Sequence, residues 1–385
     1  MAKIIATAEN YSFGPAGKLV TVCQKLIDQR HEVIFIGEGT AYQLVSKDNF
    51  KKIYRFDTDS KLFMTWGEKI FKNADVLISS VDRSSVILAK KVGLPVIWID
   101  MLFWWWDEIP EFLLDVDLYI QQNSLRNEAN TKRYADKLNN MVIVGPILDT
   151  AYKNTHIKNQ LLVAFGGMDA VGWYQIGKDS NYPYTISELL LEKVDMSSYE
   201  KVIFAGNEKI SSDLNKRYGN KKFEFKILPH NAWLKAVAES KDILINPGLE
   251  GPFDVISHER PMFFLPPYNS SAYVELEEFR KRGVANKENS IHFMDYFPYR
   301  NLGGRNLRVI MKEFLSELKT FENSPEILDD CARRINKYLK SSKTAKEKQI
   351  KRQKKFLSLL GGNGLDKTIE TINQFINNLG KQNGT

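Results

Sequence analysis

The chain has 385 residues, 43% hydrophobic and 26% charged, which is typical of a globular protein long enough for two domains. No uninterrupted apolar run reaches the roughly 18 residues that suggest a membrane span. Two cysteines and five histidines show no metal-ligand spacing, which excludes a disulfide framework and argues against a zinc site.

The net charge of +7 arises from one segment. Residues 333–355 contain eleven Lys or Arg and a single acid, Glu347, and removing them leaves 43 basic and 46 acidic residues. A solvated helix face is the simplest interpretation, and peripheral contact with an anionic membrane is the alternative. Nucleic-acid binding is disfavoured because only Tyr338 lies within the segment as a stacking aromatic.

The first half of the chain alternates between apolar runs of strand length and helical patterns. The opening run at 3–7 turns polar at once, so no signal peptide is expected and a cytoplasmic location is the default. A glycine-containing loop and a helix follow this run. Further buried strands are predicted at 32–37, 74–80, 95–100, 117–122 and 141–146. This alternation predicts a doubly wound parallel sheet.

The same alternation restarts near residue 161. Strands are predicted within 161–167, 199–206, 223–228, 242–248 and 261–267, and the pattern becomes wholly helical from about 305. The predicted organisation is a Rossmann-like domain (1–148), a linker (149–160), a second Rossmann-like domain (161–330) and a basic helical segment (331–385). Two α/β domains facing one another would leave a cleft, and glycines would break the last segment into two helices.

The loop at 246–261, "NPGLEGPFDVISHERP", is the most informative one. Ligands of open α/β sheets bind beyond the carboxyl ends of strands. Pro247 and Gly248 mark a turn, and a helix opening at Leu249 and Glu250 would present free N–H groups to a phosphate. Asp254, inside that helix, is placed to bind ribose hydroxyls. The alternatives are a simple turn glycine and a helix-surface or capping acid.

This spacing, followed by an apolar strand and "LPPYNSSAY", resembles the donor site of GT-B glycosyltransferases. The likeness is greatest to the branch containing the peptidoglycan N-acetylglucosaminyltransferase. It implies that the Gly248 turn carries the diphosphate and that Asp254, where the family has glutamate, binds ribose. Asn269, Ser270 and Ser271 stand where the family has glutamine, beside the donor sugar.

Other segments fit the same resemblance. "AFGGM" at 164–168 resembles the glycine turn that opens the family's second domain, so Gly166 and Gly167 would let the backbone approach the donor. "ILPHNAWLKAV" resembles the segment beside the nucleobase, which implies roles for Leu228 and His230. "IDMLFWWWDE" together with "LPPYNSSAY" is similar to cytosylglucuronate synthases.

The resemblance implies a metal-independent transfer with no cofactor, from a nucleotide-diphosphate sugar, most simply a UDP-sugar, to a small-molecule or lipid-linked acceptor. Relatives often place a histidine base in the first loop, but "AENYSFGPAGK" has none. Carboxylates at strand ends are the candidate bases. Asp100 is preferred, with Glu9 and Asp82 behind it, and each could instead be a capping group.

Acceptor contacts are expected in two loops. Phe13 and Gly14 lie in the first, and the stretch after residue 100 supplies Trp104, Trp105, Trp106, Asp107 and Glu108. Indole faces there could stack on a sugar-like acceptor, or they could pack under a neighbouring helix. The first loop lacks the glycine spacing of a P-loop, so Lys18 is expected on a helix surface.

Two functions other than transfer remain open on this scaffold. A nucleotide-sugar epimerase would act on the nucleotide sugar alone, and a non-catalytic protein would bind it, or a membrane surface, without turnover. An NAD-dependent dehydrogenase is disfavoured because neither domain carries a good G-x-G-x-x-G after its first strand.

Overall fold

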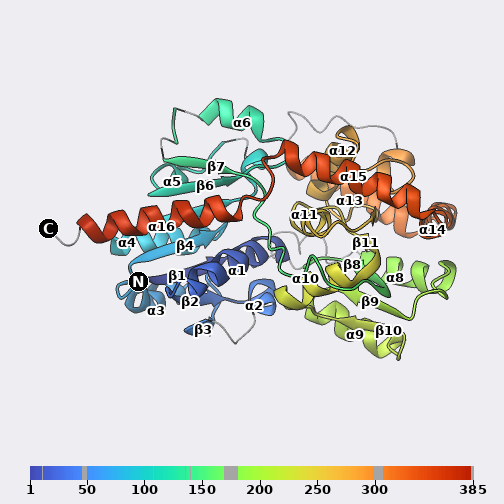
Figure 1. Ribbon diagram of the computed structural model, residues 1–385, viewed down its shortest axis with the longest axis horizontal. Helices are drawn as coiled ribbons and strands as arrows, with labels where there is room; N and C mark the ends of the chain where they lie inside the picture. Colours follow the sequence, from blue (N-terminus) through green and yellow to red (C-terminus); the bar gives the residue numbers. More distant parts are fainter. Residues whose placement is uncertain are drawn as a thin grey trace. The chain divides into compact units, whose positions relative to one another are not determined.

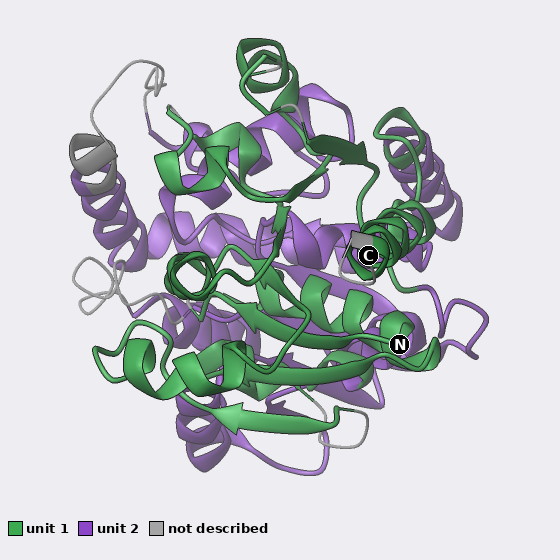
Figure 2. Cartoon of the chain, turned by 90° about the vertical axis from the view of Figure 1, so that its left-hand side faces the viewer, with its two compact units in different colours: residues 1–149, 229–231, 357–385 green, residues 150–228, 232–356 purple. Residues whose placement is uncertain are grey.

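The computed structural model describes residues 1–10, 12–45, 50–106, 108–134, 136–138, 140–168, 181–297 and 307–382. The chain divides into two compact units, shown in separate colours in Figure 2. Unit 1 comprises residues 1–149, 229–231 and 357–385, and unit 2 comprises residues 150–228 and 232–356. The first crossing from unit 1 to unit 2, after Asp149, falls at the start of the segment expected as a linker.

Unit 1 is built on a seven-stranded sheet in the order β3-β2-β1-β4-β5-β6-β7, with every neighbouring pair parallel (Figure 1). Its strands are β1 (Lys3–Ala8), β2 (Glu32–Gly37), β3 (Lys52–Arg55), β4 (Val76–Ser80), β5 (Val96–Asp100), β6 (Leu118–Gln122) and β7 (Met141–Val144). Every residue of β4, β5 and β6 is buried, which requires cover on both faces of the sheet. The sequence did not predict β3, a four-residue edge strand exposed at both ends.

Helices connect these strands and supply the cover. They are α1 (Phe13–Asp28), α2 (Gly39–Leu44), α3 (Phe63–Phe71), α4 (Arg83–Val92), η1 (Phe103–Trp105), α5 (Glu111–Leu114) and α6 (Asn127–Tyr134). The expectation that Lys18 lies on a helix surface was wrong, because its exposed fraction is 1%. Helix α1 packs against β1, β4, α2 and α16 (Leu365–Gln382), so little of its circumference near Lys18 faces solvent.

Unit 2 repeats the arrangement with a five-stranded parallel sheet in the order β10-β9-β8-β11-β12. Its strands are β8 (Lys158–Ala164), β9 (Lys201–Ala205), β10 (Phe223–Lys226), β11 (Ser240–Ile245) and β12 (Met262–Phe264). Its helices are α8 (Tyr182–Lys193), α9 (Glu208–Tyr218), α10 (His230–Glu239), α11 (Glu250–Ser257), α12 (Ser270–Lys281), η2 (Phe293–Asp295), α13 (Leu307–Glu322), α14 (Pro325–Leu339) and α15 (Lys343–Leu359). The predicted fold class of two doubly wound parallel-sheet domains with a helical C-terminus is confirmed.

The segment expected at 331–385 divides between the two units. Its basic part runs through α14 and α15, separated at residues 340–342, whereas α16 joins the core of unit 1 through Leu365, Ile369 and Ile372. The junction is held by the Asn363 side chain, which accepts from Leu148 N at 3.1 Å and donates to Leu148 O at 2.8 Å. Unit 1 is therefore completed by residues from far along the chain.

Helix α15 is fixed to the sheet of unit 2 by polar contacts. Lys346 Nζ lies 2.6 Å from Oδ1 of the fully buried Asp242, whose Oδ2 accepts from Tyr199 OH at 2.7 Å. Gln349 Nε2 donates to the carbonyl of Met262 at 2.5 Å. One lysine of the basic segment thus points inward and neutralises a buried carboxylate. No helix among the described residues is long and apolar enough to cross a membrane.

Candidate functional site

The loop after β8 is shaped by two asparagines that follow neighbouring strands. Asn207 Nδ2 donates to Gly167 O at 2.8 Å, and Asn246 Nδ2 donates to Phe165 O at 2.9 Å. Gly166 between these carbonyls has φ +75°, a conformation that favours glycine. Gly166 and Gly167 thus lie in a preformed turn at the carboxyl edge of the sheet. The two asparagines were not predicted, although each comes directly or within two residues after a strand.

The Gly248 turn leads from β11 into α11, as the sequence predicted. Leu249 is buried at the helix N-cap position, and Glu250 is the first helical residue. Asp254 is also buried, and its Oδ2 accepts a hydrogen bond from Trp233 Nε1 at 2.8 Å. A ribose at Asp254 would therefore have to share this carboxylate with an indole.

Helix α12 begins after the loop that follows β12, the strand next to β11. Asn269 caps it, because Asn269 Oδ1 accepts from Ala272 N at 2.8 Å and from Ser271 Oγ at 3.1 Å. Ser270 is buried, and its hydroxyl has no hydrogen-bond partner among the described residues. Because β11 and β12 are paired in parallel, the first turns of α11 and α12 lie at the same edge of the sheet.

Leu228 and His230, expected beside the nucleobase, have different surroundings. Leu228 is buried in unit 2. His230 groups with unit 1, where its buried ring lies with Nε2 2.8 Å from Thr21 Oγ1. The histidine ring is thus hydrogen-bonded to a hydroxyl of unit 1.

In unit 1, parallel pairing of β1 with β4 brings two predicted bases to one edge. Glu9 N donates to Ser80 O at 3.1 Å, and Asp82 follows Ser80 by two residues. Asp82 caps α4 by accepting from Ser85 N at 3.3 Å and Ser85 Oγ at 2.5 Å. Burial raises the pKa of Asp82, and the bonds from Ser85 oppose that rise. A capping role accounts for Asp82.

Glu9 is half-buried, and its pKa is raised to about 8. Burial is the largest cause, and the charges of Asp82, Asp59 and Asp57 add to it. A carboxylate destabilised in this way is a strong base once ionised. Asp57 and Asp59 were not singled out from the sequence, although an acidic pair two residues apart was visible there.

Asp100, the preferred base, is fully buried at the end of β5. Its Oδ1 accepts from Leu102 N at 2.6 Å, and its Oδ2 accepts from Trp106 Nε1 at 2.9 Å and from Tyr119 OH. Burial raises the pKa of Asp100, and these three donors act in the opposite direction. These contacts indicate that Asp100 positions the tryptophan loop. They do not favour a role in which Asp100 removes a proton from the acceptor.

The tryptophans occupy two environments. Trp104 and Trp105 lie in η1 with ring centroids 5.2 Å apart and are partly exposed, whereas Trp106 packs against the core of unit 1. Asp107 lies outside the described residues, and Glu108 is exposed. Phe13 and Gly14 are partly exposed in the first turn of α1.

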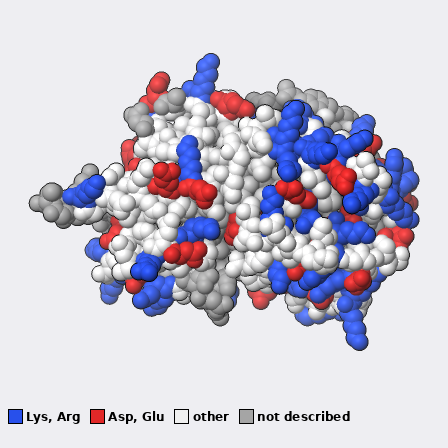
Figure 3. All heavy atoms as spheres, viewed as in Figure 1, with Lys and Arg blue, Asp and Glu red and all other residues white. Residues whose placement is uncertain are grey.

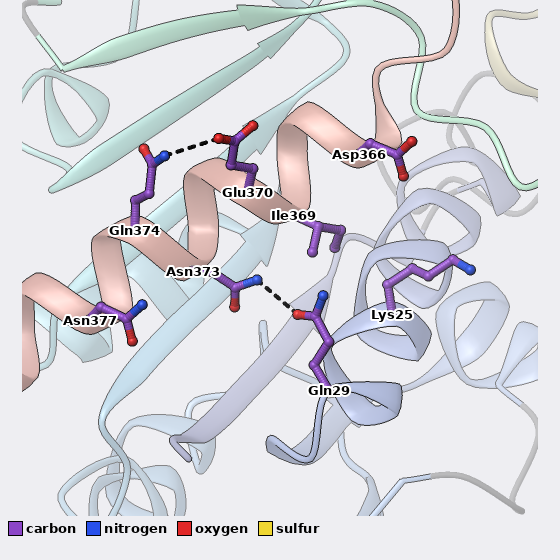
Figure 4. A pocket seen from close by; sticks show the side chains of 8 residues that line it. All are labelled: Lys25, Gln29, Asp366, Ile369, Glu370, Asn373, Gln374 and Asn377. Atoms are coloured by element: carbon purple, nitrogen blue, oxygen red, sulfur yellow. Dashed lines mark hydrogen bonds between the residues drawn. The ribbon is translucent and has the colours of Figure 1, made fainter.

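A polar groove lies elsewhere in unit 1, between α1 and α16 (Figure 4). Asn373 Nδ2 donates to Gln29 Oε1 across it at 2.8 Å. Its lining comprises Lys25, Gln29, Asp366, Ile369, Glu370, Asn373, Gln374 and Asn377. None of the predicted site residues lies there. Within the described ranges, no three His, Cys, Asp or Glu side chains are grouped so that they could hold a metal ion.

No protein-family model matches the chain, and no curated protein matches it. Several solved structures share its fold. The calicheamicin glycosyltransferase CalG4 aligns with a TM-score of 0.54 at 11% identity, over 98% of this chain and 99% of that one. The spinosyn rhamnosyltransferase SpnG, complexed with spinosyn aglycone, gives 0.52 at 11% identity, over 96% and 100%. The kitacinnamycin glycotransferase gives 0.51 at 11%, over 97% and 98%. The chain therefore has the GT-B fold predicted from its sequence.

Replacing Asp100 by Asn tests its positioning role. Asparagine offers one acceptor oxygen where the carboxylate serves three donors, and an unsatisfied buried group costs about 1–3 kcal/mol. We expect Asp100→Asn to lower the unfolding free energy by about that amount and to change tryptophan fluorescence, because Trp106 loses its acceptor. The exposed Asp115→Asn is the control. Unchanged stability and fluorescence with complete loss of turnover would return Asp100 to the role of base.

Proposed function

We propose that this protein is a glycosyltransferase that moves a sugar from a nucleotide-diphosphate sugar to a small-molecule or lipid-linked acceptor. The main support is the GT-B fold, which the chain shares over almost its whole length with three structures described as glycosyltransferases. The position of the glycine turns and helix N-termini at the carboxyl edge of the unit 2 sheet adds to it.

Unit 2 would hold the donor. The N–H groups of the Gly248 turn and the first turn of α11 would bind the diphosphate, because helix N-termini carry partial positive charge. Asn269 and Ser271 would lie near the sugar. Balance of the diphosphate charge by backbone N–H groups would make a metal ion unnecessary.

Unit 1 would hold the acceptor and supply the base. We assign the base role to Glu9 in place of Asp100, since Glu9 is partly exposed and makes no ion pair among the described residues, whereas Asp100 is enclosed by three donors. Ionised Glu9 would take the proton of the acceptor nucleophile. The nucleophile would bond to the anomeric carbon as the bond to the nucleoside diphosphate breaks.

A screen of UDP-, GDP-, CDP- and TDP-sugars by thermal shift tests the donor assignment. Selective binding of one nucleotide raises the melting temperature, because a ligand that binds only the folded state stabilises it. Turnover should then require an acceptor and should persist in EDTA. Isomerisation of the nucleotide sugar without acceptor would identify an epimerase, and stabilisation without any turnover would identify a binding protein.

The pH dependence tests Glu9. With its pKa near 8, Glu9 is protonated below that pH and accepts a proton only above it, so kcat should rise from pH 6.5 to 9. Glu9→Gln should lower kcat by about 10²–10⁴-fold with donor binding unchanged. Asp59→Asn should shift the rise to lower pH, because the Asp59 charge raises the pKa of Glu9. A Glu9→Gln enzyme with wild-type kcat would exclude this base.

We also propose that α15 docks the protein on an anionic membrane. Lys and Arg side chains gather over α14 and α15 in Figure 3. Lys348, Lys351 and Lys355 are exposed on α15 and make no ion pair among the described residues. Leu359, one turn beyond Lys355, is 68% exposed. The lysines suit the anionic headgroups of a membrane, and the exposed leucine suits the apolar acyl region beneath them. This combination fits a lipid surface better than nucleic acid.

Vesicle sedimentation tests this docking. Each lysine near an anionic surface contributes about 1 kcal/mol, so Lys348→Glu/Lys351→Glu/Lys355→Glu should weaken binding to phosphatidylglycerol vesicles by more than about a hundredfold. The control Lys209→Glu/Lys216→Glu/Lys221→Glu changes exposed lysines elsewhere in unit 2. Equal binding to phosphatidylcholine vesicles, or retention on RNA in place of vesicles, would contradict the proposal.

A further inference from the structure

Glu275 is a buried carboxyl group that the sequence did not single out. It lies on α12 with an exposed fraction of 6%. The next carboxylates on the helix, Glu277 and Glu278, both pair with Lys281 at 2.8 Å and 3.0 Å. Among the described residues, the Glu275 side chain makes no hydrogen bond or ion pair, and burial is the cause of its pKa shift. A buried carboxyl without a cation is stable in its neutral form.

The surroundings of Glu275 keep it protonated. Burial raises its pKa to about 8, so at pH 7 the carboxylic acid outnumbers the carboxylate by about tenfold. A protonated carboxyl carries an O–H donor. Burial raises the pKa of Tyr268, in the loop after β12, and the charge of Glu275 raises it further. Tyr268 therefore stays neutral over the pH range in which Glu275 ionises.

Glu275 faces the Gly248 turn. A Cβ built on Gly248 would lie 4.0 Å from Glu275 Oε2 and would meet no other atom within 4 Å outside its own neighbours in the chain. Helical side chains lean toward the N-terminus, which brings Glu275 back toward the first turn of α12. There the buried hydroxyl of Ser270 also lacks a partner in the described part of the chain. Open space beside Gly248 is thus bordered by the buried carboxyl group of Glu275.

We propose that Glu275 is a donor-binding residue, whose carboxylic acid donates a hydrogen bond to a diphosphate oxygen of the nucleotide sugar bound over Gly248. This inference rests on the proposed function. A carboxylate at this place would repel the diphosphate, whereas the neutral acid provides the donor that a phosphoryl oxygen accepts. The space that glycine leaves open beside Glu275 would admit the phosphate.

Isothermal titration with UDP between pH 7 and 9.5 tests the inference. Wild-type affinity should fall by about tenfold or more over this range, as the acid ionises. Glu275→Gln keeps an N–H donor and does not ionise, so its affinity should stay close to the wild-type value at pH 7 and remain flat with pH. Glu275→Ala should lose about tenfold or more at pH 7.

Three further variants complete the experiment. Glu277→Gln and Glu278→Gln should show the same pH dependence of UDP affinity as the wild type, since both carboxylates pair with Lys281 and neither lies beside Gly248. Gly248→Ala should keep its melting temperature but weaken UDP binding, because the added methyl group occupies the phosphate space. The inference would be overturned if the UDP affinity of Glu275→Gln fell with pH as the wild-type affinity does. It would also be overturned if Glu275→Ala bound UDP as tightly as the wild type. If the wild-type protein binds neither UDP nor another nucleoside diphosphate at any pH, the proposed donor itself is excluded.

Discussion

Parallel pairing between strands is the constraint on which both units depend. A parallel sheet requires each connection to cross back over a face, so the loops that leave the carboxyl ends of strands all emerge along one edge. In unit 1 this brings Glu9 to Ser80 and Asp82, far away in sequence. In unit 2 it brings Asn207 and Asn246 onto the turn that holds Gly166. Within each unit, the polar residues along the sheet edge come together because the sheet places them there, not because they attract one another.

Burial then decides what each carboxyl group can do. Asp242 is neutralised by Lys346, and Asp100 is held by three hydrogen-bond donors. These two groups stabilise the fold. Glu9 and Glu275 are withdrawn from water without a cation, and their pKa values rise to about 8. Groups that gain or lose a proton near neutral pH are those suited to proton transfer or to conditional hydrogen bonding.

The fold was predictable because buried parallel strands form continuous apolar runs, as in "EVIFIG" and "PVIWI". The edge strand β3 was missed, since "KIYR" is only four residues long and has just two apolar residues between two charged ones. Asp100 was correctly placed at a strand end, but periodicity does not reveal which donors will surround a side chain there. Lys18 was misplaced because the burial of α1 depends on α2 and α16, and α16 is more than 300 residues away in sequence.

Among the site residues, turns were easier to predict than side-chain contacts. Gly166 and Gly248 lie in the turns expected of them, because glycine and proline determine backbone shape locally. The partners of Asp254 and His230 come from other segments, Trp233 and Thr21, and no local pattern announces them. Glu275 lies in "VELEEF", where only the packing of α12 distinguishes it from the partly exposed Glu277 and Glu278.

The packing of α16 has a consequence for synthesis on the ribosome. Leu365, Ile369 and Ile372 belong to the same core as β1 and α1, and Asn363 bonds to Leu148 in both directions. Unit 1 therefore needs residues 357–382 before its core can close, although its first strand, β1, is synthesised before any strand of unit 2. Unit 2 lies within residues 150–356, of which only residues 229–231 belong to unit 1. It can therefore complete its sheet earlier. The unit whose first strand is synthesised earlier is the later of the two to finish folding.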